Sequence, residues 1–474
     1  MNKEIEDICT AVLDKVTPKE DERLKIETLA RELEEKVAST AKAFGVNAKV
    51  RLEGSVAKNT WLSGEPDIDI FMQLSTTITK QNLGKEALKI ARKAAEGAKQ
   101  VERFAEHPYL EAFINKTRVN IVPCYATKPG EWLSATDRTP YHTDYVKKRL
   151  GRQMQGEVRL LKKFMKGIGV YGAEIKIGGF SGYLCELLII HYKSFLKVLE
   201  YFAQYQNRMI VDIENYYEEN EHELKLLFQE PLIIVDPVDK GRNVASAVQP
   251  ERLYTFIAAS RAFLKKPSLN FFYPQETRAL TIKELKETLK KRGSTILFIV
   301  FGRVNAVSDV LWGQLYKSER SLAKLLELND FKLLRHTSWS NEENLNMFII
   351  ELESQFLPTV KKHLGPPLEK EKECWNFVAK HINSFETVSG PYIEDGRWIV
   401  ELKRKYADAV ALLNEKIIDG GRKTGVAKEI AYVLTQGFRI FTNDEIAEIY
   451  SENCAFAKFL TEFLSGKPKW LENP

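Results

Sequence analysis

Residues 54–71 read GSVAKNTWLSGEPDIDIF, and the fold class depends on this stretch. Asp67 and Asp69 flank a single isoleucine, and residues two apart in a β-strand point to the same face of the sheet. Carboxylates held this close repel each other and raise each other's pKa unless a cation lies between them. The hydrophobic residues of DIDIF nevertheless favour burial. The stretch therefore predicts a metal site at the edge of a hydrophobic strand.

A Gly-Ser pair precedes these aspartates, with eleven residues between Ser55 and Asp67. Gly54 allows backbone amides to approach a phosphate group, and amides at the head of a helix bind anions. Ser55 adds a hydroxyl, and Lys58 adds a cation one helical turn later. A phosphate cradle followed by paired carboxylates on the next strand suits metal-assisted phosphoryl transfer. Each half alone is more often a turn or an exposed strand edge, but the combination favours the functional interpretation.

The length of 474 residues predicts about three domains of roughly 150 residues each. A formal net charge of +5 supports a polyanionic partner only weakly. The five cysteines are widely spaced and form no CxxC pair, which predicts a reduced compartment without a disulfide framework or structural zinc. The sequence shows no signal peptide and no membrane span. We expect a soluble, cytoplasmic protein with no membrane partner.

Apolar periodicity predicts two helices over residues 4–44, broken at TPKED. Three short strands follow, at residues 48–54, 67–74 and 118–125. With a helix near residues 84–101, they predict a small α/β domain. A basic stretch at 143–176 then precedes one long helix, SGYLCELLIIHYKSFLKVLEYF, at 181–202.

The C-terminal half is predicted to be mixed α/β. Its strands are expected in STILFIVFG, NMFIIELES and RWIVELKR because these segments are rich in β-branched and aromatic residues. Two Gly- and Pro-containing segments, HLGPPLEK and VSGPYIEDG, are predicted to be turns. The residues of this half indicate no chemistry by themselves.

The Gly-Ser pair, the short gap and the acid–hydrophobic–acid motif resemble the signature of the DNA polymerase β nucleotidyltransferase superfamily. Six segments in this order resemble a narrower family, the archaeal-type (class I) CCA-adding tRNA nucleotidyltransferases. They are GSVAKNTWLSGEPDIDIF, DRTPYHTDYV, EVRLLKKFMKGIGVYGAE, GGFSGYLCELLI, DPVDKGRNVASAV and GPYIEDGRW. The resemblance covers nearly the whole chain.

This resemblance implies an α+β multidomain fold. A polymerase-β-like nucleotidyltransferase head would occupy 1–142, and a helical and mixed neck with nucleotide-base recognition would occupy 143–270. An α/β body and tail at 271–474 would bind tRNA. The implied activity is template-independent addition of C, C and A to the 3′ end of tRNA, with CTP and ATP as substrates and two Mg²⁺ ions as cofactor. The protein would bind the tRNA at its acceptor stem and T arm. Whether the chain forms a homodimer is left open by the sequence.

In the family three carboxylates hold two magnesium ions, and the matching positions here are Asp67, Asp69 and Asn120. The chain departs from the family at the third position, where the family would have aspartate. Asparagine offers an oxygen but carries no charge and cannot act as a base. We expect the ion that activates the attacking hydroxyl to be weakened most, at a cost of roughly 3–5 kcal/mol, or on the order of 10²–10⁴ in rate. We interpret Asn120 as a deliberate Asp→Asn substitution, with a naturally impaired paralogue as the alternative.

The resemblance also implies nucleotide contacts. Gly54, Ser55 and Lys58 would bind the triphosphate, with Lys162 and Tyr171 near the triphosphate and sugar. The alternatives are a solvated charge for the lysine and a core aromatic for the tyrosine. In TPYHTDY, the family's polar contact matches either His142 or Thr143, and both stay open.

Arg242 is the residue expected to read the incoming base, because its planar guanidinium presents a fork of donors. Asp236 and Asp239 are expected to orient it. The alternative is a helix-capping turn in DPVDKGRN, with the arginine paired to an aspartate.

Two other functions remain open. One is a nucleotidyltransferase that makes oligoadenylate or poly(A) tails, which incorporation of CTP would exclude. The other is a non-catalytic protein that binds tRNA and nucleotide, which Asn120 makes worth testing. An Asn120→Asp variant that stayed inactive would favour it.

Overall fold

The structure is a computed structural model that describes residues 3–104 and 106–471. It divides into two compact units, one comprising residues 1–276 and 467–474 and the other residues 277–466. All of the residues expected to act on a nucleotide belong to the first unit.

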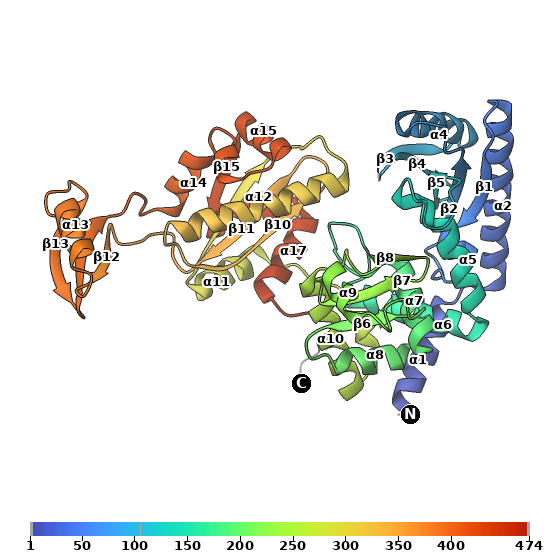
Figure 1. Cartoon of the computed structure of the whole chain (residues 1–474), viewed down its shortest axis with the longest axis horizontal. Helices are drawn as coiled ribbons and strands as arrows, with labels where there is room; N and C mark the ends of the chain where they lie inside the picture. The colour runs from blue at the N-terminus through green and yellow to red at the C-terminus, as the bar shows by residue number, and fades with distance from the viewer. Residues whose placement is uncertain (1–2, 105, 472–474) are drawn as a thin grey trace. The chain divides into compact units, whose positions relative to one another are not determined.

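The first unit begins with a five-stranded sheet of order β1-β2-β5-β4-β3. Its strands are β1 (Lys49–Glu53), β2 (Asp67–Leu74), β3 (Lys99–Phe104), β4 (Pro108–Ile114) and β5 (Thr117–Tyr125). The central pair, β2 and β5, is parallel, and the other neighbours are antiparallel. Helices α2 (Glu20–Ala43) and α4 (Lys80–Ala94) pack against one face, which includes Ile68 and Ile70 (Figure 1). Because strand residues alternate, Asp67 and Asp69 lie on the opposite face.

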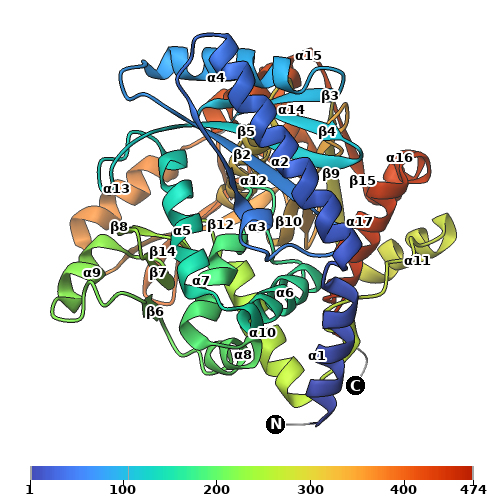
Figure 2. The same cartoon turned by 90° about the vertical axis from the view of Figure 1, so that its right-hand side faces the viewer.

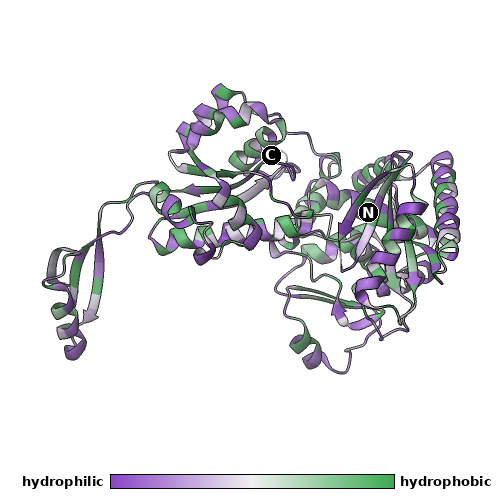
Figure 3. Cartoon of the chain, turned by 90° about the horizontal axis from the view of Figure 1, so that it is seen from above, coloured by the Kyte–Doolittle hydropathy of each residue, from purple (hydrophilic) through white to green (hydrophobic). Residues whose placement is uncertain are grey.

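The two helices predicted for the N-terminal region are confirmed as α1 (Lys3–Val16) and α2. Helix α2 is mostly hydrophilic, as its colour in Figure 3 shows. Its buried residues recur at helical spacing and include Ile26, Leu33 and Val37. This single apolar stripe is typical of a helix with one face on a sheet.

Two boundaries predicted from sequence are wrong. The helix expected near residues 84–101 is α4, which ends at Ala94, and residues 99–101 belong to edge strand β3, whose pairing with β4 overrides helical propensity. The long helix expected at 181–202 is two helices, α7 (Gly182–Tyr192) and α8 (Phe195–Ala203). Lys193 adopts a left-handed conformation that ends α7. The Ser194 hydroxyl caps α8 by accepting a hydrogen bond from the backbone N–H of Lys197.

The remaining helices of this unit contribute to three separate hydrophobic cores. These helices are α3 (Gly54–Ala57), α5 (Thr139–Arg149), α6 (Arg152–Gly167), α9 (Glu221–Leu227) and α10 (Pro250–Lys265), with 3-10 turns at Ala135–Arg138 and Leu269–Phe271. A small sheet joins β6 (Met209–Asp212), β7 (Leu232–Asp236) and β8 (Asp239–Asn243). Aromatic rings around Phe164 fill the core between α6, α8 and α10. Figure 2 shows α5, α6 and α7 grouped below the five-stranded sheet.

The second unit contains a four-stranded sheet of order β10-β11-β9-β15. Its strands are β9 (Thr295–Phe301), β10 (Leu333–Ser340), β11 (Asn346–Leu352) and β15 (Phe438–Thr442). The helices of the unit are α11 (Ile282–Arg292), α12 (Ser308–Leu328), α13 (Glu371–His381), α14 (Ala409–Ile417), α15 (Lys428–Gln436), α16 (Ala447–Glu452) and α17 (Cys454–Ser465), with 3-10 turns at Arg422–Thr424 and Asn443–Ile446. The strands predicted in STILFIVFG and NMFIIELES are confirmed as β9 and β11.

A three-stranded sheet in this unit corrects another expectation. The order is β12-β14-β13, with β12 (Val360–Pro367), β13 (Thr387–Glu394) and β14 (Arg397–Lys403). HLGPPLEK and VSGPYIEDG were expected as turns, but most of each lies in β12 or β13. Both are edge strands whose register shifts beside Pro366 and Pro391, and edge strands with bulges accept proline. The strand in RWIVELKR is confirmed as the central β14.

All five cysteines are free thiols. Among residues 3–104 and 106–471, no helix combines the length and apolar character needed to cross a bilayer.

Candidate active site

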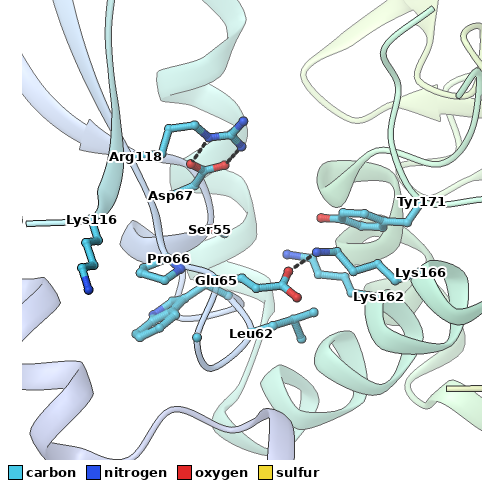
Figure 4. Close-up of a pocket in the computed structure, with 12 residues that line it drawn as sticks. Ser55, Leu62, Glu65, Pro66, Asp67, Lys116, Arg118, Lys162, Lys166 and Tyr171 are labelled. Carbon is cyan, nitrogen blue, oxygen red and sulfur yellow. Dashed lines mark hydrogen bonds and ion pairs between the residues drawn. The ribbon is translucent and has the colours of Figure 1, made fainter. Parts of the chain in front are cut away.

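The parallel pairing of β2 and β5 brings together the three residues predicted as metal ligands. Asp67 lies opposite Arg118, and Asp69 lies opposite Asn120. The Asn120 Nδ2 donates a hydrogen bond to Asp69 Oδ1 at 2.9 Å, while two guanidinium nitrogens of Arg118 donate to the two Asp67 oxygens (Figure 4). Burial raises the pKa of Asp69 to about 6, and the Asn120 hydrogen bond opposes this rise. Both carboxylates therefore face nitrogen donors from β5.

Gly54 closes this arrangement at the start of the short helix α3. Its φ of +71° lies in the left-handed region that favours glycine. A Cβ at this position would overlap the Asp69 carboxylate, so glycine is also required by space. On β1, Glu53 lies opposite Asp69 in the register and is fully buried. The GS motif thus packs directly against the second aspartate.

A cavity of about 330 Å³ opens beside Asp67. Its polar lining includes Ser55, Asp67, Lys116, Arg118, Lys162, Lys166 and Tyr171 (Figure 4). Lys166 forms an ion pair with Glu65, and its ammonium lies 5.4 Å from the centre of the Tyr171 ring. Cations gathered beside a carboxylate pair suit a polyphosphate carried with a metal ion. The predicted residues Ser55, Lys162 and Tyr171 therefore line one cavity with Asp67.

Two of the predicted phosphate-binding lysines are held by one buried carboxylate. Lys58 Nζ lies 2.5 Å from Glu186 Oε2 on α7, and Lys162 Nζ lies 3.6 Å from Glu186 Oε1. The Thr60 hydroxyl donates to the same carboxylate at 2.6 Å and accepts from Lys162 Nζ at 3.1 Å. Burial acts to raise the pKa of Glu186, but the two lysine charges outweigh it and leave the pKa below its ordinary value. The solvated-charge interpretation of Lys162 does not describe this side chain, which is 3% exposed.

A second polar cluster surrounds Asp236 at the end of β7. His142 Nε2 lies 2.9 Å from Asp236 Oδ2, and Arg242 Nη1 donates to the same oxygen at 2.6 Å. The His142 ring stacks on Tyr183 with ring centres 4.1 Å apart. Burial acts to raise the pKa of Asp236, but its partners hold it below the ordinary range. Burial lowers the pKa of His142, which favours the neutral ring.

Thr143 faces elsewhere, since it is buried beside Glu53. The structure corrects two details of the arginine site. Asp239 does not orient Arg242 but pairs with Arg138 at 2.7 Å. The segment DPVDKGRN is a hairpin between β7 and β8, not a helix-capping turn, although Arg242 is paired to an aspartate as that alternative required.

Arg118 and Glu186 are not among the residues predicted from the sequence. A signal for each is nevertheless present. Arg118 precedes Asn120 by two residues, the spacing of Asp67 and Asp69, so alternation alone places it on the same face. Glu186 is a single acid in an apolar helical run, and a buried charge requires a partner.

The donor set fits one divalent cation well. Carboxylate oxygens of Asp67 and Asp69 are the ligands that Mg²⁺ prefers, and a half-turn of the Asn120 amide would add its oxygen. Within the described part of the chain, no group of three or more His, Cys, Asp or Glu side chains is arranged to hold a metal.

Three family models match the chain in succession. They are a nucleotidyltransferase domain at residues 26–142, the second domain of tRNA nucleotidyltransferase at 156–273, and the C-terminal domain of the CCA-adding enzyme at 292–443. The chain is also similar to the CCA-adding enzyme of Methanosarcina barkeri, with 39% identity over 94% of this chain and 95% of the relative. The CCA-adding enzyme of Methanosarcina acetivorans is 38% identical over the same shares. That of Methanothermobacter thermautotrophicus is 35% identical over 96% of this chain and 97% of the relative.

Proposed function

Because the chain belongs to the CCA-adding enzymes and is a tRNA nucleotidyltransferase, we propose that it adds C, C and A to tRNA 3′ ends from CTP and ATP. The observation that carries this proposal is Asp67 at the cavity that Ser55, Lys162 and Tyr171 line, with Asp69 on the same face of β2 beside Gly54. The cavity presents cations for a triphosphate beside carboxylates for its metal ion.

In this proposal the triphosphate lies along the GS turn. The Ser55 hydroxyl donates to a phosphate oxygen, Lys162 reaches the triphosphate, and the Tyr171 ring lies beside the sugar. Glu186 holds Lys58 and Lys162 in place, so their charges need no reorganisation when the nucleotide binds. Preorganised charge of this kind is a large contributor to transfer reactions.

Base reading is assigned to the cluster at Asp236. Arg242 is partly exposed, at 35%, while its carboxylate partner is fully buried. The anchored guanidinium therefore keeps nitrogen donors free for acceptors on cytosine or adenine. His142, stacked on Tyr183, is the polar residue of TPYHTDY that we assign to the nucleotide; Thr143 is buried and is assigned to packing.

Asp67 and Asp69 would hold the magnesium ion of the incoming nucleotide, with Asn120 as a neutral third ligand. When bound, the metal neutralises charge on the triphosphate and favours ionisation of the tRNA 3′-hydroxyl. In the family's two-ion arrangement, the ion that activates the attacking hydroxyl would depend on Asn120 and would be bound more weakly. We propose that asparagine at this position slows transfer by on the order of 10²–10⁴ relative to aspartate.

Recognition of tRNA is assigned to the rest of the chain. We propose the division into a head (1–142), a neck (143–270) and a body with tail (271–474), with the acceptor stem and T arm as the bound region. The stretch 143–176 supplies phosphate contacts, which position the tRNA without specifying its sequence. Body and tail would read helix shape, since A-form RNA hides its base edges.

Asn120 supports a second candidate function, that of a non-catalytic binding protein. Under it the chain binds tRNA and nucleotide without transferring, because asparagine stands where the third carboxylate of the site would be. This candidate shares every binding contact described above and differs only in turnover.

The test compares the unaltered chain with Asn120→Asp for incorporation of labelled CTP and ATP into tRNA that lacks its 3′ CCA. We expect slow, ordered addition by the unaltered chain and faster addition by the variant. A Glu102→Gln variant, changed at an exposed carboxylate, controls for general effects of substitution. If neither the unaltered chain nor Asn120→Asp adds nucleotide while both bind tRNA, the binding candidate replaces the enzyme. Incorporation of ATP alone would favour the poly(A)-type activity.

A further inference from the structure

Strand β5 presents two nitrogen donors to the two carboxylates of β2. The Arg118 guanidinium grips both oxygens of Asp67, and the Asn120 amide donates to Asp69. The parallel register sets both pairs, because Arg118 lies opposite Asp67 and Asn120 lies opposite Asp69. The register of the strand backbone therefore places each donor residue opposite its carboxylate.

This arrangement changes the charge of the metal site. A site with three carboxylates carries three negative charges, enough to hold two divalent ions about 3.5–4 Å apart. Here two carboxylates, one guanidinium and one neutral amide leave a single negative charge. Like charges repel each other strongly at such a separation, and a permanent cation on Asp67 adds to that repulsion. A second divalent ion is therefore disfavoured twice, by the missing carboxylate and by the added guanidinium.

Glu53, opposite Asp69 on β1, is already paired with Arg51, whose Nε lies 2.9 Å from Glu53 Oε1. Glu111 lies opposite Asn120 on β4. It does not replace the missing charge, because Arg103 Nη2 donates to its Oε1 at 2.8 Å. Arg118, by contrast, is about half exposed and lines the cavity beside Asp67. Its charge faces the space that the triphosphate and the tRNA 3′ end would share.

We propose that Arg118 supplies the positive charge of the second metal ion, so that the chain works with one divalent cation, the one carried by the nucleotide. This inference rests on the proposed function. Arg118 is a positioning residue: it fixes the orientation of Asp67 and balances its charge, as a bidentate guanidinium does.

Counting bound metal tests the proposal without any turnover. Equilibrium dialysis would measure Mn²⁺ bound per chain in the presence of saturating, non-hydrolysable CTP, equal in both chambers. We expect one Mn²⁺ per chain for the unaltered sequence. We expect two for the double variant Arg118→Gln/Asn120→Asp, which removes the guanidinium and supplies the third carboxylate. Two ions on the unaltered chain, or one on the double variant, would overturn the proposal.

Two further variants separate charge from structure. Arg118→Lys keeps the charge and should still bind one Mn²⁺, and binding of two would show that positive charge is not the deciding property. Arg92→Gln removes an arginine from an exposed ion pair with Glu102, and this variant should also bind one Mn²⁺ per chain. A second ion on that variant would show that any lost surface cation has the same effect, which also overturns the proposal.

Transfer rates provide an independent comparison. With Asn120 present, Arg118→Gln should slow CCA addition by at least about tenfold, because charge at the reacting centre is lost. In the Asn120→Asp background, the same change should not slow it. Equal slowing in both backgrounds would contradict the exchange of arginine for metal. Failure of every chain to add nucleotide would refute the proposed function, whereas the Mn²⁺ count would still be measurable.

Discussion

Lys58 Nζ lies 2.5 Å from Glu186 Oε2, although 128 residues separate the two in the chain. Both side chains are nearly fully buried, and the same carboxylate lies within ion-pair distance of Lys162. A carboxylate shared by two buried lysines holds in place the charges expected to meet the triphosphate. The relationship ties the GS motif to α7.

Glu186→Gln should destabilise the chain and weaken nucleotide binding together. The change leaves two buried lysines without a counter-charge, which costs about 3–5 kcal/mol for a buried pair. Displaced lysines should also raise the KM for CTP and ATP. Urea denaturation measures the first effect and steady-state kinetics the second.

Glu102→Gln is the matched control, since that carboxylate pairs with Arg92 at the surface. We expect its loss to stay below about 1 kcal/mol, as is usual for exposed pairs. Equal effects of the two variants on stability and KM would contradict the role given to Glu186.

Gly54→Ala should impair metal and nucleotide binding more than stability. An alanine there would be strained at a φ of +71° and would also push on Asp69. Gly45→Ala is the control, because Gly45 has the same φ and open space around it. Both variants should lose about 1–2 kcal/mol from the left-handed conformation. Only Gly54→Ala should lose Mn²⁺ affinity in dialysis, and equal affinity losses would contradict the contact with Asp69.

Local alternation was sufficient to predict that Asp67 and Asp69 share one face of a strand, whereas Asn120 was matched to the third ligand position only by the family resemblance. The pairing of β2 with β5, which was not predicted from the sequence, places Asn120 opposite Asp69. Alternation also places Arg118 on the same face as Asn120, but only the strand pairing brings its guanidinium beside Asp67. Spacing within a short segment therefore predicts which residues share a face, and strand pairing decides which of them meet.

Other features depend on contacts that no short segment contains. Glu186 contacts Lys58 because α7 packs below the sheet. Asp239 pairs with Arg138 rather than Arg242 because the β7–β8 hairpin faces the 3-10 turn before α5. HLGPPLEK was predicted as a turn because prolines usually end strands, yet edge strands tolerate them. Whether a strand lies at an edge is decided by its neighbours.

Glu53→Gln should stabilise the metal-free chain at neutral and higher pH. Burial raises the pKa of Glu53 from 4.5 to about 7, despite the nearby Arg51. The unfolded chain therefore releases this proton first, so the stability of the unaltered chain falls as pH rises from about 4.5 to 7 and then levels off. The glutamine variant lacks this loss, and its advantage should grow by up to about 3 kcal/mol across that range.

Denaturation in the presence of EDTA at about pH 5 and about pH 8, on either side of most of this change, measures the difference. The charged neighbours Arg51, Asp144 and Lys147 are the same in both chains, so the difference isolates Glu53. Glu102→Gln again serves as the control for an exposed carboxylate. A stability gap that does not change with pH would show that the folded Glu53 ionises like its unfolded form.

Arg242→Lys should lower base selection more than binding of the triphosphate. Lysine keeps the charge beside Asp236 but loses the planar fork that two base acceptors would use. Loss of one charge-assisted hydrogen bond, about 1.5–3 kcal/mol, should reduce kcat/KM for the correct nucleotide by roughly 10- to 150-fold. The measurement compares CTP and ATP on one tRNA that lacks its last C and A and on another that lacks only the final A. Lys266→Arg, at the end of α10, controls for exchange of the two cations away from the cluster. If Arg242→Lys lowers kcat/KM equally for CTP and ATP on both tRNAs, Arg242 holds the triphosphate and other groups read the base.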